Sequence, residues 1–211
     1  VLTPRPRRIG LFGGTFDPVH NAHLALARAA LQALALDAVR WVPTGQPWQK
    51  ARSITPAAHR EAMLRLALAG EPRFVLDRIE LEREGPSYTL DTVRALQAAQ
   101  PGATWFLLIG ADQYAGLHTW HGWRDLLDRV VLAVAARPGV AAAPQPEVLA
   151  HAHRVVPLPP MAVSATDIRS RVAAGLPLGD LVPPAVATYI DQHALYGACT
   201  QPGAPTPSTR S

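Results

Sequence analysis

Short apolar runs alternate with longer segments of helical periodicity along most of the chain. Apolar runs predict buried strands, and apolar residues recurring every three or four positions predict helices. The expected strands cover residues 7–13, 38–43, 73–76, 103–110, 129–139 and 153–159, and the expected helices cover residues 21–34, 55–70, 87–99, 164–175 and 183–193. This order predicts an α/β fold, a doubly wound parallel sheet with right-handed crossovers. Ligands of such sheets bind beyond the carboxyl ends of the strands.

Two of the expected helices carry signals at their ends. Thr55 is the expected N-cap of the second helix, with Pro56 at its first helical position and Gly70 at its end. Ser164 opens the fourth helix, where Asp167 would complete a capping box.

Length and composition bound the kind of protein. The chain has 211 residues, of which 48% are hydrophobic, which suits one globular domain with a sizeable core. We expect this domain at residues 9–197, after a basic arm at 1–8 and before a disordered tail at 198–211 that is rich in Pro, Gly, Ser and Thr. A single cysteine excludes an internal disulfide, and charges or prolines interrupt every apolar run, so we expect a cytoplasmic protein without a membrane segment. The oligomeric state stays open.

The formal net charge of +4 does not indicate a nucleic-acid partner. Four arginines, at positions 5, 7, 8 and 210, lie in the acid-free ends of the chain. Without them sixteen basic residues face sixteen acidic ones, and no basic stripe with interleaved aromatic residues is left. We therefore expect no binding to RNA or DNA.

The stretch "GGTFDPVHNAH" follows the first predicted strand and enters the first predicted helix. Gly13 and Gly14 leave the backbone bare, and the helix start presents N–H groups and a positive dipole end to an anion. His20 and His23 are three residues apart, so they share one face of a first helical turn and can donate hydrogen bonds to the same polyphosphate. Together these residues predict phosphate chemistry.

Other interpretations of this stretch are weaker. It matches neither the dinucleotide fingerprint GxGxxG nor a P-loop. A glycine pair after a strand is often only a turn, and a histidine near a helix start is often a surface residue. A zinc site would need a third ligand that the sequence does not supply, so we expect no protein-bound metal.

One further cation stands out. Lys50 is the only lysine among twenty basic residues. A compact ammonium suits a confined phosphate site where the planar fork of arginine does not fit. From the residues alone, a chance lysine on a solvated loop is an equal alternative.

The motifs in this order resemble the bacterial nicotinate-nucleotide adenylyltransferase family, in the nucleotidyltransferase superfamily with the T/HxGH motif. The resemblance covers residues 9–196 and includes "GGTFDPVHNAH", "VPTGQPWQK", "SYTLDT", "IGADQ", "TWHGW", "RPG" and "SATDIR". It implies a Rossmann-like nucleotidyltransferase fold and the transfer of an adenylyl group from ATP, bound with Mg²⁺, to nicotinate mononucleotide. The products would be nicotinate adenine dinucleotide and pyrophosphate, in NAD biosynthesis.

The resemblance also implies roles for single residues. His20 and His23, with Lys50 and Arg169, would be catalytic and hold the triphosphate. ATP would bind to a further set: Gly13, Gly14, Thr15, Phe16, Gly110, Asp112, Ser164 and Thr166. Nicotinate mononucleotide would bind to Thr89, Trp120, His121 and Arg137, with the indole of Trp120 stacked on the cationic pyridinium ring.

Several of these residues have a structural alternative. Gly110 and Asp112 could simply cap a helix, Ser164, Thr166 and Arg169 could do the same, and Arg137 could form a surface salt bridge. Trp120 and Trp123 could share one apolar helix face, although we assign Trp123 to the core.

The sequence departs from the family pattern at three places. Ala22 stands where the motif usually has glycine, Ala165 where a serine is common, and Gln49 where a histidine often precedes the lysine. A pantetheine-phosphate or choline-phosphate transferase would share the first motif but does not need the tryptophan loop. A non-catalytic nucleotide sensor would lack the phosphate-binding groups that are present here.

Overall fold

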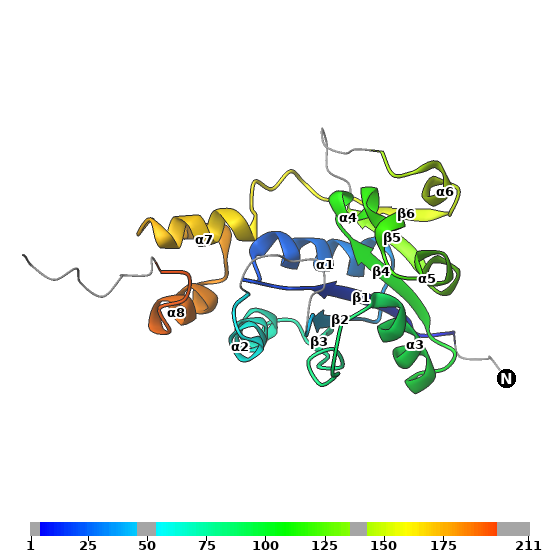
Figure 1. Ribbon diagram of the computed structural model, residues 1–211, viewed down its shortest axis with the longest axis horizontal. Coiled ribbons are helices and arrows are strands. Elements are labelled where there is room, and N and C mark those ends of the chain that lie inside the picture. The colour runs from blue at the N-terminus through cyan, green and yellow to red at the C-terminus, as the bar shows by residue number, and fades with distance from the viewer. Residues whose placement is uncertain (1–4, 46–53, 136–142, 198–211) are drawn as a thin grey trace, which may run out of the picture.

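The computed structural model describes residues 5–45, 54–135 and 143–197 (Figure 1). Within them all six expected strands form one parallel sheet in the order β3-β2-β1-β4-β5-β6. The strands are β1 (Arg8–Gly14), β2 (Ala38–Pro43), β3 (Phe74–Leu76), β4 (Thr104–Ile109), β5 (Val131–Ala135) and β6 (His153–Val156). The predicted doubly wound parallel sheet is therefore confirmed.

The five expected helices are also present, with short additional ones between them. The expected set is α1 (Asn21–Ala33), α2 (Ala57–Leu68), α3 (Thr89–Ala99), α7 (Ala165–Ala173) and α8 (Pro184–Gln192). The additional set is α4 (Ala111–Ala115), α5 (Trp123–Arg129), α6 (Pro146–Leu149) and two 3₁₀ turns, η1 (Leu117–Thr119) and η2 (Gly179–Leu181). The additional helices have only three to seven residues each, too few for a helical period to show in the sequence.

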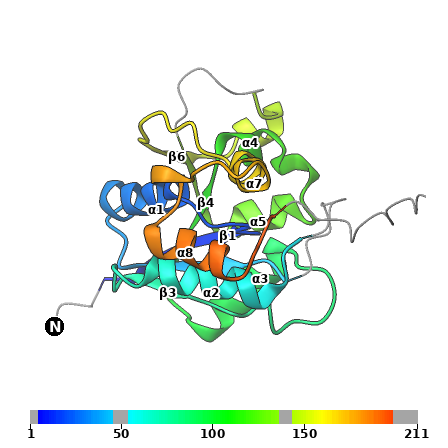
Figure 2. The same ribbon diagram turned by 90° about the vertical axis from the view of Figure 1, so that its left-hand side faces the viewer.

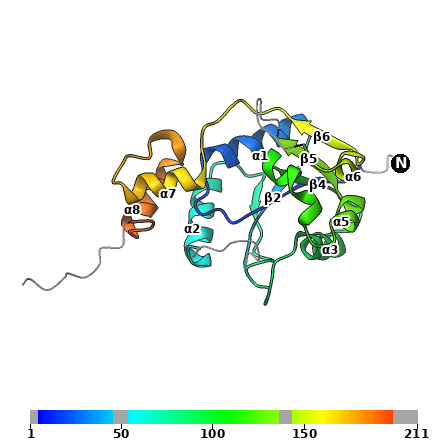
Figure 3. The same ribbon diagram turned by 45° about the horizontal axis from the view of Figure 1, so that its top comes forward.

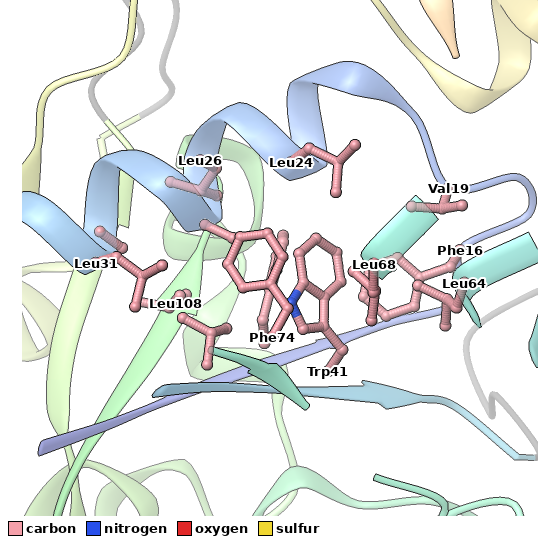
Figure 4. Packing of buried hydrophobic residues seen from close by; sticks show 14 of the residues in the cluster. Phe16, Val19, Leu24, Leu26, Leu31, Trp41, Leu64, Leu68, Phe74 and Leu108 are labelled. Carbon is pink, nitrogen blue, oxygen red and sulfur yellow. The ribbon is translucent and has the colours of Figure 1, made fainter. Parts of the chain in front are cut away.

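Two hydrophobic clusters cover the two faces of the sheet. On one face α1, α2, α7 and α8 pack against side chains of the sheet that include Phe12. Figure 4 shows Trp41 and Phe74 of this cluster below the leucines of α1. On the other face α3, α4, α5 and α6 pack against Leu11 and Trp105. Alternate residues of β1 and β4 point to opposite faces, because side chains alternate along a strand.

The two closing helices gather at one end of the molecule. Figure 2 shows α8 lying beside α2, and the two helices are in contact. Figure 3 shows α7 and α8 at the end opposite to α3 and α5. In Figure 1 β1 points toward this end, so the closing helices lie beyond its carboxyl end.

The start of α2 corrects one expectation. Pro56, not Thr55, occupies the N-cap position, its backbone is extended (φ −48°, ψ 144°), and the helix ends at Leu68 rather than at Gly70. Thr55 stands one residue before the cap: the N–H groups of His59 and Arg60 donate to the carbonyl of Pro56, while the carbonyl of Thr55 accepts from Nε of Arg60 and its N–H donates to Asp17.

The order of the strands places a crevice between β1 and β4. β1 pairs with β2 on one side and with β4 on the other. The chain leaves β1 toward α1 on one face and leaves β4 toward α4 on the opposite face. Such a switch point leaves a crevice at the carboxyl ends of the two strands, where doubly wound sheets bind their ligands.

Candidate active site

A cavity of about 500 Å³ opens at this switch point. One wall comes from residues 13–17, at the carboxyl end of β1 and just beyond it, and from the start of α1; a second comes from residues 110–113 after β4. The start of α3 and residues 120–121 form a third wall, and residues 163–165 close the remaining side. The size is that of a typical small-molecule site.

The two histidines lie at the start of α1 and face this cavity. His20 is the N-cap of the helix and His23 follows in the first turn. Their rings are stacked, with centroids 3.6 Å apart and an interplanar angle of 18°. The rings of Phe12 and Phe16 contact the His23 ring edge-on, at 5.8 and 5.2 Å between centroids. The three-residue spacing of His20 and His23 therefore brings both imidazoles side by side at the cavity, as predicted.

A backbone contact determines which nitrogen of His23 can donate. The N–H of His20 donates a hydrogen bond to Nδ1 of His23 over 3.2 Å. Because Nδ1 is the acceptor, the neutral ring carries its proton on Nε2. His23 thus offers an N–H donor beside the start of a helix, where the helix dipole also favours an anion.

The glycine pair leaves space for two different reasons. A Cβ on Gly13 would meet no atom within 4 Å, so the backbone is open to the cavity. A Cβ on Gly14 would lie 3.1 Å from the ring of Phe16, so this glycine leaves space for a buried aromatic side chain. Both glycines line the cavity, and at Gly13 the bare backbone borders open space.

Residues 15–17 are held by partly buried hydrogen bonds from other elements. Nη1 of Arg60 donates to the carbonyl of Thr15 (2.9 Å), and Nη1 of Arg169 donates to the carbonyl of Asp17 (2.7 Å). The hydroxyl of Tyr196 donates to Oδ1 of Asp17 (2.8 Å). The loop also contains a cis peptide bond before Pro18. The three hydrogen bonds from Arg60, Arg169 and Tyr196 fix the backbone of this loop, which lines the site.

Burial changes the pKa values behind this loop. Desolvation is the main cause that lowers the pKa of Arg60, which is 2% exposed. Desolvation and the charge of Asp17 raise the pKa of Tyr196 far above its ordinary value. The phenol therefore stays protonated and remains a donor to the carboxylate.

The third wall, opposite the histidine pair, is built around Trp120. Trp120 is half-buried and packs against the second hydrophobic cluster, while Trp123 is buried in it, as predicted. The two do not share a helix face, since Trp120 is the C-cap of η1 and Trp123 begins α5. The rings of Tyr88 and His121 stack with centroids 4.4 Å apart, which joins this loop to the start of α3.

Most of the predicted site residues line the cavity. The structure places the following together there: Gly13, Gly14, Thr15, Phe16, His20, His23, Thr89, Gly110, Asp112, Trp120, His121 and Ser164. Gly110 is also the N-cap of α4, and Ser164 caps α7 by accepting a hydrogen bond from the N–H of Asp167 (3.1 Å). Both can therefore have a structural role as well. Ala22 lines the cavity too, so the methyl group that replaces the usual hydrogen faces the site.

Four of the predicted catalytic or binding residues do not line this cavity in the structure: two lie elsewhere and two fall outside the described residues. Thr166 and Arg169 line a second, more open hollow with Thr55 and Tyr196. The guanidinium of Arg169 is engaged there by Thr166 and by the carbonyl of Asp17. Lys50 and Arg137 lie outside the described residues.

The cavity also includes residues that the sequence interpretation missed. Asp17 and Glu80 line it although both are almost fully buried. Arg60 had a recognisable signal, because it falls on the buried face of α2 with Met63 and Leu64, where a charged residue is unusual. The contact between Asp17 and Tyr196 joins residues too far apart in the sequence to be noticed.

The described residues lack two further kinds of feature. They contain no group of three or more His, Cys, Asp or Glu side chains that could hold a metal ion. None of their helices is long and apolar enough to cross a membrane.

The fold and the cavity define a class. A parallel sheet with a glycine-bearing turn, a histidine pair and a helix start at its switch point is typical of α/β proteins that bind nucleotides or other phosphorylated ligands.

Comparison with known proteins narrows this class. Residues 11–171 match the cytidylyltransferase-like family. A protein of Methylibium petroleiphilum, described as a "probable nicotinate-nucleotide adenylyltransferase", is 54% identical over 196 residues, which cover 90% of this chain and 92% of that protein. One of Bordetella petrii with the same description is 50% identical, and the match covers 90% of this chain and 99% of that protein. The chain therefore belongs to the cytidylyltransferase-like family, among the nicotinate-nucleotide adenylyltransferases.

A solved structure agrees with the fold. Nicotinic acid mononucleotide adenylyltransferase of Plasmodium falciparum, determined in complex with NaAD, superposes with a TM-score of 0.76 over 90% of this chain and 97% of that chain. At 18% sequence identity this likeness concerns the architecture.

Proposed function

We propose that the protein transfers the adenylyl group of ATP to nicotinate mononucleotide, which yields nicotinate adenine dinucleotide and pyrophosphate. The observation that carries this proposal is one cavity with two chemically different walls. The start of α1 offers His20 and His23 to phosphate, and the opposite wall offers Thr89 and Trp120 to a planar ring. The family to which the chain belongs supports the same reaction.

The reaction needs alignment more than acid–base chemistry. An oxygen of the mononucleotide phosphate forms a bond to the α-phosphorus of ATP, while the bond from that phosphorus to the bridging oxygen of the β-phosphate breaks. The attacking phosphate is already an anion, so no general base and no covalent enzyme intermediate are required. The protein has to hold two anions in line and stabilise the charge that develops.

His20 and His23 would make the main contribution to this stabilisation. The Nε2–H of His23, set by the bond between His20 N–H and Nδ1, would donate to the phosphate oxygens. Lys50 and Arg169 would supply further positive charge. Because the Arg169 guanidinium is bound to the loop carbonyl of Asp17, its contribution would include fixing that loop.

The adenosine of ATP would lie along the turn after β1 and the start of α4. Residues 13–16, Gly110, Asp112, Ser164 and Thr166 are the proposed contacts. Mg²⁺ would enter with the triphosphate, as part of the substrate, and would neutralise charge on its oxygens.

The acceptor would lie against the opposite wall. The pyridinium ring would stack on Trp120, and Thr89, with the backbone around His121, would bind the carboxylate. Arg137 is the proposed phosphate contact on this side. A cytoplasmic location and the division into arm, domain and tail stay predictions.

The test is pyrophosphate release from ATP and Mg²⁺ with three acceptors. Nicotinate mononucleotide should be used best, its amide counterpart more slowly, and phosphopantetheine not at all. Turnover with phosphopantetheine alone would instead assign the protein to another branch of the superfamily. Absence of release with all three would contradict an enzymatic role.

A further inference from the structure

Glu80 is a buried acidic residue in the wall of the cavity that the reaction itself does not use. It lies in the segment between β3 and α3, it is 6% exposed, and it lines the cavity beside Ser87 and Thr89. A negative group here cannot serve as a phosphate ligand, because it would repel the phosphate oxygens. Its partners indicate another use.

The carboxylate is bonded to the first turn of α3. Oγ1 of Thr92 donates a hydrogen bond to Oε1 of Glu80 over 2.8 Å, and Thr92 is itself only 1% exposed. Nη1 of Arg83 donates to the same Thr92 hydroxyl over 3.1 Å. The hydroxyl therefore accepts from Arg83 and donates to Glu80, so its single proton is directed at the carboxylate.

The backbone of Glu80 is also tightly packed, against Gly45. A Cβ on Gly45, which follows β2, would lie 2.1 Å from the carbonyl oxygen of Glu80 and 3.4 Å from Oγ of Ser87. Only a residue without a side chain fits at this distance. The end of β2, Glu80 and the entry to α3 are thus locked together.

The segment held in this way carries the proposed acceptor contacts. Thr89 begins α3, and Tyr88 stacks on His121 of the tryptophan loop. On the other side of this junction, a Cβ on Gly122 would lie 2.4 Å from Cδ2 of Leu90. The acceptor wall is therefore a tight assembly of two segments, and Glu80 anchors one of them.

We propose that Glu80 is a positioning residue for the acceptor: through Thr92 it fixes the start of α3 so that Thr89 and Trp120 stand ready for the pyridine ring. This inference rests on the proposed function. Burial raises the pKa of Glu80, against the opposing effects of Thr92, Arg83 and Ser87. A carboxyl that is costly to bury and that is held by the hydroxyl of Thr92 agrees with a positioning role.

The test compares Glu80→Ala, Glu80→Gln, Thr92→Val and Thr92→Ser by steady-state kinetics with each substrate varied in turn. Glu80→Ala and Thr92→Val should raise the KM for nicotinate mononucleotide about 10-fold and leave the KM for ATP within about 2-fold, since misplaced positioning groups act locally. Glu80→Gln still accepts from the Thr92 hydroxyl and Thr92→Ser retains that hydroxyl, so both should stay near wild type. Glu82→Ala, an exposed change in the same segment, is the matched control.

The double variant Glu80→Ala/Thr92→Val adds a second criterion. Because both single changes remove one interaction, the double variant should be hardly worse than either. Equal increases in both KM values, or an unchanged acceptor KM in folded Glu80→Ala or Thr92→Val protein, would overturn the positioning role. If Glu80→Gln changed the preference between the acid and the amide acceptor, the positioning role would be overturned, because Glu80 would then contact the acceptor directly. An inactive wild type would instead contradict the proposed function.

Discussion

The hydroxyl of Tyr196 donates to Oδ1 of Asp17 over 2.8 Å, between residues 179 positions apart. Asp17 belongs to the loop after β1, and Tyr196 follows the last helix. The end of the described chain therefore holds the loop on which the histidine pair depends. The same carboxylate receives the N–H of Thr55 at 3.4 Å, so α2 is connected to this junction as well.

Tyr196→Phe tests this junction. The change removes one hydrogen bond to a buried carboxylate, and we expect the free energy of unfolding to fall by about 2 kcal/mol, the range for bonds to charged groups. Urea denaturation with an unchanged m-value measures it. Tyr189→Phe, which removes a half-buried bond to Nδ1 of His59, is the control and should cost less. A smaller loss for Tyr196→Phe than for the control would contradict the importance of the junction.

His23 can be tested so that catalysis and helix capping separate. His23→Asn retains an acceptor close to the backbone N–H of His20 but lacks the Nε2 donor, whereas His23→Ala loses both. We expect both variants to lose at least ~100-fold in turnover, the scale of one preorganised donor. Only His23→Ala should also lower the melting temperature, by the equivalent of about 1 kcal/mol. Turnover close to wild type in folded His23→Asn would show that the Nε2–H of His23 does not contribute to catalysis.

Local patterns predicted the sheet and the part of the site that lies on neighbouring residues. His20 and His23 were identified because a three-residue spacing acts within one helical turn, and the switch point followed from alternating strands and helices. Glu80 and Tyr196 could not be found in this way, since their partners are set by packing between distant segments. At Thr55 the local rule was wrong, because the helix begins one residue later, with Pro56 as N-cap, and the backbone of Thr55 bonds to the distant Asp17 instead.

Glu80 should make stability depend on pH in a defined direction. Burial raises its folded pKa above the ordinary value of 4.5, so between these two pKa values the native state binds more protons than the unfolded state. Its contribution to stability is therefore greatest at low pH and is lost as the pH rises through the folded pKa. Relative to Glu80→Gln, the wild type should become progressively less stable above pH 4.5.

Unfolding midpoints of the two proteins measured from pH 4 to 8 provide the comparison, because contributions from all other groups cancel in the difference. The exposed Glu82→Gln should give a flat difference over the same range. A flat difference for Glu80→Gln would mean that Thr92, Arg83 and Ser87 balance the effect of burial, and one of opposite sign would mean that they outweigh it.

The preference between acid and amide acceptors depends on Thr89 and Trp120 in different ways. Both mononucleotides carry the same cationic ring, so stacking on Trp120 cannot separate them, and discrimination has to come from donors that pair with a carboxylate. The NH₂ group of the amide would oppose these donors and leave at least one unpaired. This costs roughly 1 to 3 kcal/mol, or about 5- to 150-fold in kcat/KM.

Trp120→Ala should accordingly lower kcat/KM for both acceptors by a similar factor of about 10, from the loss of stacking on a cationic ring. Thr89→Val retains the shape of the side chain and removes its hydroxyl, so it should mainly reduce the preference for the acid. The measurement is kcat/KM for each acceptor at saturating ATP. A wild type that used the amide as well as the acid would leave adenylyl transfer in place but remove the basis for placing the carboxylate at Thr89. A Thr89→Val variant with undiminished preference would assign that task to the backbone around Trp120 and His121 alone.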